Sequence, residues 1–344
     1  MHPTVRTTWL RLGRRVVQPP LCLTSSSIVN TYYQTIKIPC IGPVWRAFSS
    51  ARSNLNATSI ATPSVQSPEA AKTAASKYQL PAQFDISDRI VAATGGGGGL
   101  TLCNAEFLAK LGAHVYCLDY QEEPSVEWLH TQARVADSKT GSLTYVRLDT
   151  RNYEEQEAVF AHIADKHNGI HGLIAGAGVN FVMPALDYPP EQVDRVMDIN
   201  FKGVFYSARA CARQMIKYKT PGSIVLIASM SARVANRGLL CSVYNASKAA
   251  VDQLARSLAA EWSQIVDGKP IRVNSLCPGN VVTPMVLKNF ADEPHLKAQW
   301  EDQNMLKRLS ESSEYTGAML YLLSDASSFK TGASEIVDGG YTAW

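Results

Sequence analysis

The sequence predicts an α/β protein built on one seven-stranded parallel sheet, and three observations lead to this prediction. From Ile90 onward, short apolar runs alternate with helix-length amphipathic segments, which is typical of consecutive β-α-β units. A run of five glycines directly follows the first apolar run. The 344 residues, 46% of them hydrophobic, suit one large domain with an appendage. We therefore expect a single doubly wound domain with right-handed crossovers.

Each expected strand is a short apolar run, and each expected helix is a longer amphipathic segment. The strands are expected at 89–94, 113–118, 143–148, 171–176, 222–228, 270–276 and 334–338. The helices are expected at 101–112, 124–138, 153–168, 190–217, 241–264 and 312–324. In such a sheet, ligands bind beyond the carboxyl ends of the strands, where the strand order reverses.

The first strand runs directly into Gly95–Gly99, and a helix follows from about Thr101. Glycine lets the backbone turn sharply, so that N–H groups and a helix N-terminus can approach a pyrophosphate. A flexible linker is the alternative interpretation of five glycines, but a strand before them and a helix after them argue against it. The sequence therefore predicts a bound dinucleotide at this loop.

The second strand ends in Asp119, about twenty residues past the glycine loop. A carboxylate at this place can accept hydrogen bonds from the adenosine ribose and repels a 2′-phosphate. Glu122 and Glu123 add negative charge, and no Arg or Lys follows Asp119 until Arg134. We therefore expect NAD as the cofactor, with NADP as the alternative.

The fifth strand ends in serine hydroxyls, and a tyrosine and a lysine follow it. The apolar run Ile224–Ala228 predicts a buried strand that leads into Ser229 and Ser231. Tyr244 and Lys248 are four residues apart and share one helix face. An ammonium beside a phenol lowers the phenol's pKa from about 10, which suits proton transfer at a carbonyl or alcohol. For this spacing alone, a solvated lysine above a half-buried tyrosine is the alternative.

Together these segments resemble the short-chain dehydrogenase/reductase family, whose pattern extends from about Ser87 to Trp344. The resemblance implies a Rossmann fold. It also implies that Tyr244 acts as general acid in ketone reduction and as general base in alcohol oxidation. Lys248 would lower the pKa of Tyr244 and hold the nicotinamide ribose, while a serine would hydrogen-bond the substrate oxygen. Asn200 would hold a water that connects Lys248 to solvent. The implied catalytic tetrad is Asn200, Ser229, Tyr244 and Lys248.

Two serines compete for the catalytic position. Ser231 lies 13 residues before Tyr244, which is a common spacing in the family, and Ser229 lies 15 residues before it. Strand register favours Ser229, because it follows Ile224–Ala228 directly and the extra residues fit an insertion in Met230–Cys241. The alternative, Ser231, stays open on the sequence alone.

The resemblance also assigns cofactor contacts, and two positions depart from the family pattern. Thr101 stands where the last glycine of the loop is expected, and Gly176 replaces an asparagine that usually braces the sheet. These departures suggest a non-catalytic cofactor-binding scaffold as one alternative. The implied contacts are Thr94, Gly95, Gly99 and Leu100 in the glycine loop, Asp119 and Asp149 at the adenosine, Gly178 after the fourth strand, Lys202, Tyr244 and Lys248 along the pocket, and Val281 and Thr283 at the nicotinamide.

The segments around Ser229 and Tyr244, and the ending Asp338–Trp344, look like the fungal polyol dehydrogenase branch of this family. That branch, which includes D-arabinitol 2-dehydrogenase, mannitol dehydrogenase and sorbose reductase, interconverts ketoses and alditols. A ketoreductase for acyl, steroid or secondary-metabolite ketones is the enzyme alternative, and a more apolar pocket would favour it. The expected substrate lid is Met285–Lys307, with Asn289, Glu293, His295, Trp300 and Asp302 as its sugar-compatible side chains.

The first 68 residues contain no Asp or Glu but carry seven Arg and Lys residues. Such an acid-free basic segment is typical of a mitochondrial transit peptide, and Arg46–Ser50 looks like a cleavage site. We therefore expect a transit peptide at 1–52, a flexible linker at 53–80 and the Rossmann domain at 81–344, with a disordered N-terminal extension. The protein would be mitochondrial, or cytoplasmic if this segment is not a functional presequence.

Composition gives no sign of binding to nucleic acid, a membrane or a metal, so the expected partner is a small-molecule substrate. Without residues 1–52 the formal charge changes from +3 to −4, so no basic patch suggests nucleic acid. No stretch approaches the roughly 20 apolar residues of a membrane span. The seven cysteines lack paired metal spacing, so we expect reduced core thiols and no metal. The apolar faces of helices 190–217 and 241–264 suggest a homodimer or homotetramer, with burial inside the monomer as the alternative.

Overall fold

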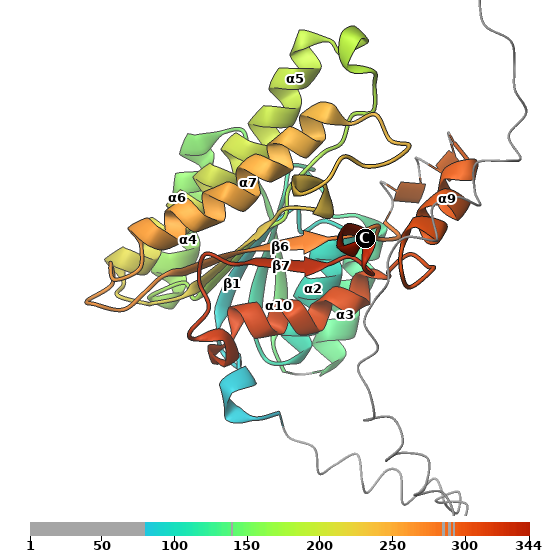
Figure 1. The fold of residues 1–344 in the computed structure, drawn as a ribbon. Coiled ribbons are helices and arrows are strands. Elements are labelled where there is room, and N and C mark those ends of the chain that lie inside the picture. Colours follow the sequence, from blue (N-terminus) through green and yellow to red (C-terminus); the bar gives the residue numbers. More distant parts are fainter. Residues whose placement is uncertain (1–79, 139, 284–285, 288–289, 292) are drawn as a thin grey trace, which may run out of the picture. The chain divides into compact units, whose positions relative to one another are not determined.

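The computed structural model describes residues 80–138, 140–283, 286–287, 290–291 and 293–344, so the predictions for 1–52 and for 53–79 lie outside the described residues. Seven strands form one sheet in the order β3-β2-β1-β4-β5-β6-β7 (Figure 1). Every neighbouring pair is parallel, which confirms the predicted doubly wound sheet. The strands are β1 (Ile90–Thr94), β2 (His114–Asp119), β3 (Ser142–Arg147), β4 (Gly172–Ala175), β5 (Ser223–Ile227), β6 (Arg272–Pro278) and β7 (Ser334–Val337).

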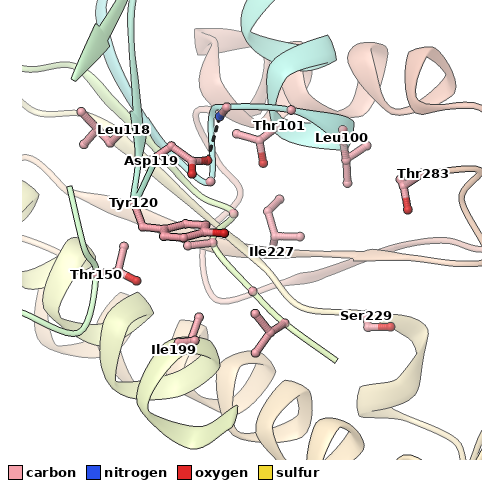
Figure 2. Close-up of a pocket in the computed structure, with 18 of the residues that line it drawn as sticks. Leu100, Thr101, Leu118, Asp119, Tyr120, Thr150, Ile199, Ile227, Ser229 and Thr283 are labelled. Atoms are coloured by element: carbon pink, nitrogen blue, oxygen red, sulfur yellow. Dashed lines mark hydrogen bonds between the residues drawn. The ribbon is translucent and has the colours of Figure 1, made fainter. Parts of the chain in front are cut away.

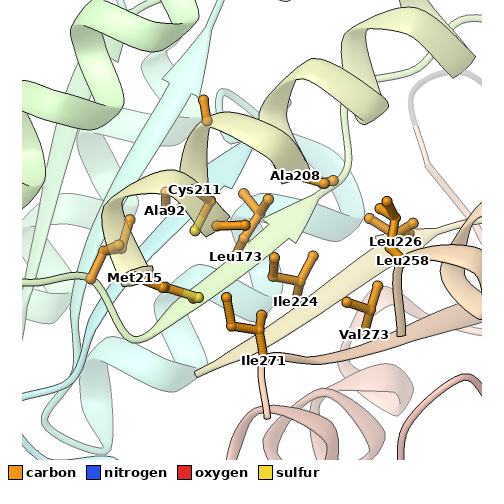
Figure 3. Close-up of a cluster of buried hydrophobic side chains, with 14 of the residues drawn as sticks. Ala92, Leu173, Ala208, Cys211, Met215, Ile224, Leu226, Leu258, Ile271 and Val273 are labelled. Atoms are coloured by element: carbon orange, nitrogen blue, oxygen red, sulfur yellow. The ribbon is translucent and has the colours of Figure 1, made fainter. Parts of the chain in front are cut away.

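Helices cover both faces of the sheet (Figure 1). One face packs against α2 (Gly99–Lys110), α3 (Val126–Ser138) and α10 (Thr316–Leu323). The other face packs against α4 (Tyr153–His167), α6 (Val204–Lys217) and α7 (Ser242–Glu261), where side chains such as Leu173, Ile224 and Met215 interlock (Figure 3). The short 3₁₀ segments are η2 (Ala82–Phe84), η3 (Ala185–Asp187), η5 (Met230–Ala232), η6 (Ser312–Tyr315), η7 (Asp325–Ser327) and η8 (Tyr341–Ala343).

The central strands are continuously apolar because both of their faces are buried. All five residues of β1 are buried, and successive side chains enter opposite cores. Ile90 and Ala92 belong to the core under α4, α6 and α7, whereas Val91 and Ala93 belong to the core under α2, α3 and α10. Burial on both sides explains why these strands were visible in the sequence as unbroken apolar runs.

The segment predicted as one helix at 190–217 is interrupted in the structure. It consists of α5 (Pro190–Met197), the π-helical segment η4 (Asp198–Gly203) and α6. A π-helical segment is rare and is often found at functional sites. Asn200 lies inside η4, so the interruption coincides with a predicted site residue. The lid segment also contains a helix that was not predicted, α9 (His295–Gln303).

The apolar faces that suggested self-association are buried in the monomer. Ala208, Cys211 and Met215 of α6 and Val251 and Leu258 of α7 all belong to one core cluster. Burial in the core of the monomer therefore explains why these side chains are apolar, and no partner subunit is needed to explain it. The homodimer or homotetramer stays a prediction.

The core under α4 gives a direct test of the fold. Phe160 of α4 is fully buried, so Phe160→Ala should destabilise the domain by about 3–5 kcal/mol because it leaves a cavity. Urea denaturation followed by circular dichroism measures this free energy of unfolding. The matched control is Phe329→Ala at a fully exposed phenylalanine, which should change it by no more than about 0.5 kcal/mol. Equal losses in the two variants would contradict the core described here.

Candidate active site

A cavity of about 640 Å³ opens at the carboxyl ends of the strands, where β1 and β4 lie side by side and the strand order reverses. Its volume lies within the range of cofactor and substrate sites. The lining comes from the glycine loop, from the segments after β2 to β6 and from α7 (Figure 2). The sequence-predicted residues that line it are Gly95, Gly99, Leu100, Asp119, Asp149, Gly178, Ser229, Tyr244, Lys248, Val281 and Thr283.

Three predicted site residues do not line this cavity. Thr94 is buried at the end of β1, and its hydroxyl accepts a hydrogen bond from the Ala177 N–H at 3.4 Å. Asn200 is also fully buried. Lys202 was predicted to line the pocket, but it does not. Its ammonium pairs with Asp198 one helical turn away, at 2.7 Å, and its side chain is 57% exposed.

The predicted lid residues also lie away from the cavity. Trp300 packs in a small apolar cluster with Leu296 and Leu309. Glu293, His295 and Asp302 are exposed, and Asn289 lies outside the described residues. Among the described residues, the predicted lid therefore contributes only the apolar Val286 to the cavity wall.

The glycine loop presses against the end of β2. Gly95 and Gly99 have φ angles of +69° and +57°, which favour glycine. The Gly97 N–H donates a hydrogen bond to Asp119 Oδ2 at 2.9 Å, drawn as the dashed line in Figure 2. Helix α2 begins at Gly99, and the first N–H groups of a helix have no partner within it. The loop thus fits a dinucleotide, with free helix N–H groups for phosphate and a fixed carboxylate for ribose.

The two departures from the family pattern meet in space. A Cβ atom at Gly176 would lie 2.2 Å from Thr101 Oγ1 and 3.0 Å from the Thr94 carbonyl oxygen. Both distances are too short for an ordinary contact, and Thr101 and Gly176 both line the cavity. The Thr101 side chain therefore occupies the space that a side chain at position 176 would need. Because Gly176 has no side chain, there is room for Thr101 at this place.

Tyr244 and Lys248 lie on successive turns at the start of α7. The Lys248 ammonium donates a hydrogen bond to the Ile227 carbonyl at 2.8 Å and lies 5.7 Å from the centre of the Tyr244 ring. Burial raises the pKa of Tyr244 to about 12, although a hydrogen bond with Ser229 opposes the rise. Burial also lowers the pKa of Lys248 to about 8. The expected lowering of the tyrosine pKa by the lysine is therefore not seen, because desolvation of both groups dominates.

Ser229, rather than Ser231, lines the cavity. Ser229 follows β5 and caps η5, where its Oγ accepts a hydrogen bond from the Ser231 N–H at 3.1 Å. The Ser229 hydroxyl also donates to Ser231 Oγ at 3.0 Å. The structure thus brings Ser229 to Tyr244, while Ser231 is buried behind it.

The Asn200 side chain joins three segments. Its Oδ1 accepts from the Val179 N–H at 2.8 Å, and its Nδ2 donates to the Val179 carbonyl at 2.9 Å and to Ser247 Oγ at 3.0 Å. These bonds connect η4, the segment after β4 and α7. Nδ2 thus makes two hydrogen bonds and Oδ1 accepts one, and the water at Asn200 stays a prediction. Gly178 packs against this junction, and its Cβ would lie 3.4 Å from both Asn200 Oδ1 and Lys248 Nζ.

Several lining residues were missed in the sequence, and some of them lie close to a predicted one in the chain. Tyr120 comes directly after Asp119, and its ring projects toward the middle of the cavity in Figure 2. Arg151 comes two residues after Asp149 and binds its carboxylate through Nε and Nη2, which lowers the pKa of Asp149. Glu127, at the start of α3, also lines the adenosine end. The available signal for Tyr120 was its position directly after a strand end, and for Arg151 it was the position two residues after Asp149.

The wall near Ser229 and Tyr244 is mostly apolar. The side chains there are Val179, Ile227, Ala228, Val281 and Val286, and Thr283 adds a hydroxyl. In the described part of the chain, no group of His, Cys, Asp and Glu side chains could hold a metal ion. The helices of that same part are too short or too polar to cross a membrane.

The chain is similar to known dehydrogenases and reductases. A family model described as enoyl-(acyl carrier protein) reductase matches residues 97–342. The short chain dehydrogenase/reductase notP′ of Aspergillus versicolor is 38% identical, over 76% of this chain and 89% of that protein. The ribulose-forming D-arabinitol 2-dehydrogenase of Candida tropicalis is 35% identical, over 76% of this chain and 95% of that protein. The crystal structure of a short-chain type dehydrogenase/reductase from Mycobacterium marinum has a TM-score of 0.68 at 31% identity, over 76% and 98% of the two chains.

The contact between Thr101 and position 176 can be tested by mutation. Gly176→Ala should destabilise the domain by about 1–3 kcal/mol through overpacking and should weaken NADH binding, because the first turn of α2 must move. Adding Thr101→Gly should restore part of both, since the 2.2 Å contact disappears while the 3.0 Å contact to Thr94 remains. Fluorescence titration and chemical denaturation measure the two effects, with Thr101→Gly alone as the control. An equal effect of Gly176→Ala in both backgrounds would contradict this contact.

Proposed function

Because the chain belongs to the short-chain dehydrogenase/reductase family, we propose that it transfers a hydride between NAD(H) and a polyol/ketose pair. The chain is an NAD(P)-dependent alcohol dehydrogenase of the polyol branch of that family. One observation carries the proposal: a single cavity joins the glycine loop to Ser229, Tyr244 and Lys248. The similarity to D-arabinitol 2-dehydrogenase, which extends over 95% of that protein, supports an alditol such as D-arabinitol and its ketose as the substrates.

Tyr244 is the proposed proton donor and acceptor. The bound nicotinamide supplies the hydride in reduction and accepts it in oxidation. In ketone reduction the carbonyl oxygen takes the phenol proton of Tyr244, and in alcohol oxidation the phenolate takes the hydroxyl proton. A pKa of about 12 keeps Tyr244 protonated near neutral pH, as the proton donor in ketone reduction must be.

Ser229 and Lys248 support this proton transfer. The Ser229 hydroxyl lies against Tyr244 and can donate a hydrogen bond to the substrate oxygen, where negative charge develops in reduction. Lys248 uses one N–H for the Ile227 carbonyl, so two further donors remain for ribose hydroxyls and for the phenol. With a pKa of about 8, Lys248 is mostly charged at neutral pH and can stabilise the phenolate of the oxidative direction.

Asn200 has a proposed positioning role. Its amide links the segment after β4 to Ser247, one residue before Lys248. This link supports a fixed distance between the lysine and the nicotinamide end of the cavity. The Asn200 side chain itself need not touch the substrate or the cofactor.

NAD is the proposed cofactor in preference to NADP. Asp119 lies at the adenosine end, held in place by the Gly97 N–H, and Glu127 adds a second carboxylate to the same wall. A 2′-phosphate would bring its charge close to both carboxylates. Two cations line the cavity, Arg151 and Arg195, and Arg151 uses Nε and Nη2 to bind Asp149.

A second candidate is a ketoreductase for a less polar ketone. The apolar wall formed by Val179, Ile227, Val281 and Val286 favours it, since few side chains near Tyr244 can bind the hydroxyls of a sugar. The exposed positions of Glu293, His295 and Asp302 favour it as well. The relative from Aspergillus versicolor, whose name states no substrate, is compatible with either candidate.

The proposal is tested by NADH oxidation in the presence of carbonyl substrates. The protein should reduce at least one of D-ribulose, D-fructose, L-sorbose and L-xylulose, followed as the loss of absorbance at the nicotinamide band. Tyr244→Phe should lower kcat by about 10²–10⁴-fold because the general acid is removed. The control Tyr218→Phe alters a tyrosine that bonds Asp165 outside the cavity and should leave kcat unchanged. Reduction of a bulky aromatic ketone alone would favour the second candidate, and NADH binding without any turnover would favour a scaffold.

Cofactor preference is tested at Asp119. Asp119→Ser should raise the NADH dissociation constant and lower that of NADPH, so that their ratio changes at least about tenfold, because a carboxylate near the 2′-position is removed. Fluorescence titration measures both constants without any substrate. Glu123→Gln removes an exposed carboxylate that does not line the cavity and should leave the ratio nearly unchanged. An unchanged ratio in Asp119→Ser would refute the role of this carboxylate.

A further inference from the structure

We propose that Arg233 is a positioning residue, which anchors the turn after Ser229 to Asp252 on helix α7 and so fixes the serine against Tyr244. The inference rests on the proposed role of Ser229. It adds a residue that lies outside the cavity and touches neither substrate nor cofactor. Its basis is a buried carboxylate that joins four segments of the chain.

Asp252 lies one helical turn after Lys248, on the helix face that also carries Tyr244. Only 6% of its side chain is exposed. Burial by itself raises the pKa of Asp252, but hydrogen bonds from Ser275, Ser334 and Arg256 outweigh this effect and lower it, so the carboxylate is charged. A buried charge of this kind is stable only when its partners stay in place.

The partners of Asp252 come from different elements. Ser275 of β6 donates to Oδ1 at 2.6 Å, and Ser334 of β7 donates to the same oxygen. Arg256 of α7 binds Oδ2 at 2.8 Å, and Arg233 binds it at 3.1 Å. Arg233 also donates to Ser334 Oγ at 2.7 Å. The guanidinium of Arg233 is therefore held by one group on helix α7 and one on the edge strand β7.

Arg233 and Ser229 belong to one hydrogen-bonded turn. The Ala232 N–H donates to the Ser229 carbonyl at 3.0 Å, and the Arg233 N–H donates to the Met230 carbonyl at 2.9 Å. The Ser231 N–H donates to Ser229 Oγ at 3.1 Å. Movement of Arg233 is thus transmitted to the Ser229 hydroxyl through this short turn.

Arg256 provides the matched comparison. It binds the same oxygen of Asp252, but from four residues further along α7, so it connects the helix only to itself and to Ser334. Its side chain has about the same exposure as that of Arg233, 38% against 39%. Loss of either arginine removes one cation from Asp252, but only loss of Arg233 frees the turn that carries Ser229.

The test compares Arg233→Gln with Arg256→Gln in the full-length protein. We expect Arg233→Gln to lower kcat for carbonyl reduction about tenfold or more, because displacement of a reacting group by about 1 Å can reduce a rate about 100-fold. The dissociation constant of NADH, measured by fluorescence titration, should stay unchanged, since Arg233 does not line the cavity. Arg256→Gln should keep a kcat near that of the wild type. Arg233→Lys should recover part of the rate, because it restores the charge but not the planar shape of the guanidinium, whose Nη2 contacts both Asp252 and Ser334.

Equal kcat losses in the two glutamine variants, or an unchanged kcat in Arg233→Gln, would overturn the proposal. Hydrogen exchange of the peptide that covers residues 229–236 separates it from the proposed function, because exchange needs no substrate. Faster exchange in Arg233→Gln than in Arg256→Gln would support the anchor even if the wild-type protein reduced no ketose. Identical exchange in both variants would refute the anchor, whatever the activity of the wild type.

Discussion

The parallel pairing of β1 with β4 is the constraint on which the rest of the site depends. It brings the glycine loop and the segment after β4 so close that a Cβ at Gly95 would lie 2.8 Å from the Ala177 nitrogen. Only bare backbone fits at this crossing. One cavity extends along this crossing, with Asp119 at one end and Ser229 with Tyr244 at the other. Cofactor and catalytic residues therefore share one space because two strands that are distant in sequence are neighbours in the sheet.

The two ends of the cavity differ in chemical character. The adenosine end is rich in charge, with Asp119, Glu127, Asp149 and Arg151 on its wall. The end at Ser229 and Tyr244 has apolar walls, so the polar groups in contact with a substrate there are mainly the catalytic ones. The polyol relatives and the apolar wall thus point to different substrates within the same reaction. Binding of a sugar at such a wall would rest on few hydrogen bonds, and selectivity among ketoses would then depend on shape.

The sequence was sufficient for the sheet because all central strands are buried on both faces and appear as apolar runs. It was also sufficient for the residues at strand ends, such as Asp119 and Ser229, since strand register places them. Other features depend on contacts that no local pattern records. Thr101 and Gly176 are 75 residues apart in the chain, and their contact appears only after the sheet is assembled. The raised pKa of Tyr244 depends on burial, and the position of Lys202 depends on a competing ion pair with Asp198.

The π-helical segment η4 changes the direction in which the side chains point between helix α5 and helix α6. An ordinary helix advances by about 100° per residue, so one extra residue in a turn rotates everything after it by that angle. Helix α5 packs against α7, whereas α6, which continues the same path, packs against α4. With the shift at Asp198–Gly203, one continuous stretch of chain presents apolar side chains in two directions. The widened turn also turns the Asn200 amide inward, so a single irregularity serves both the packing of the domain and the geometry around Lys248.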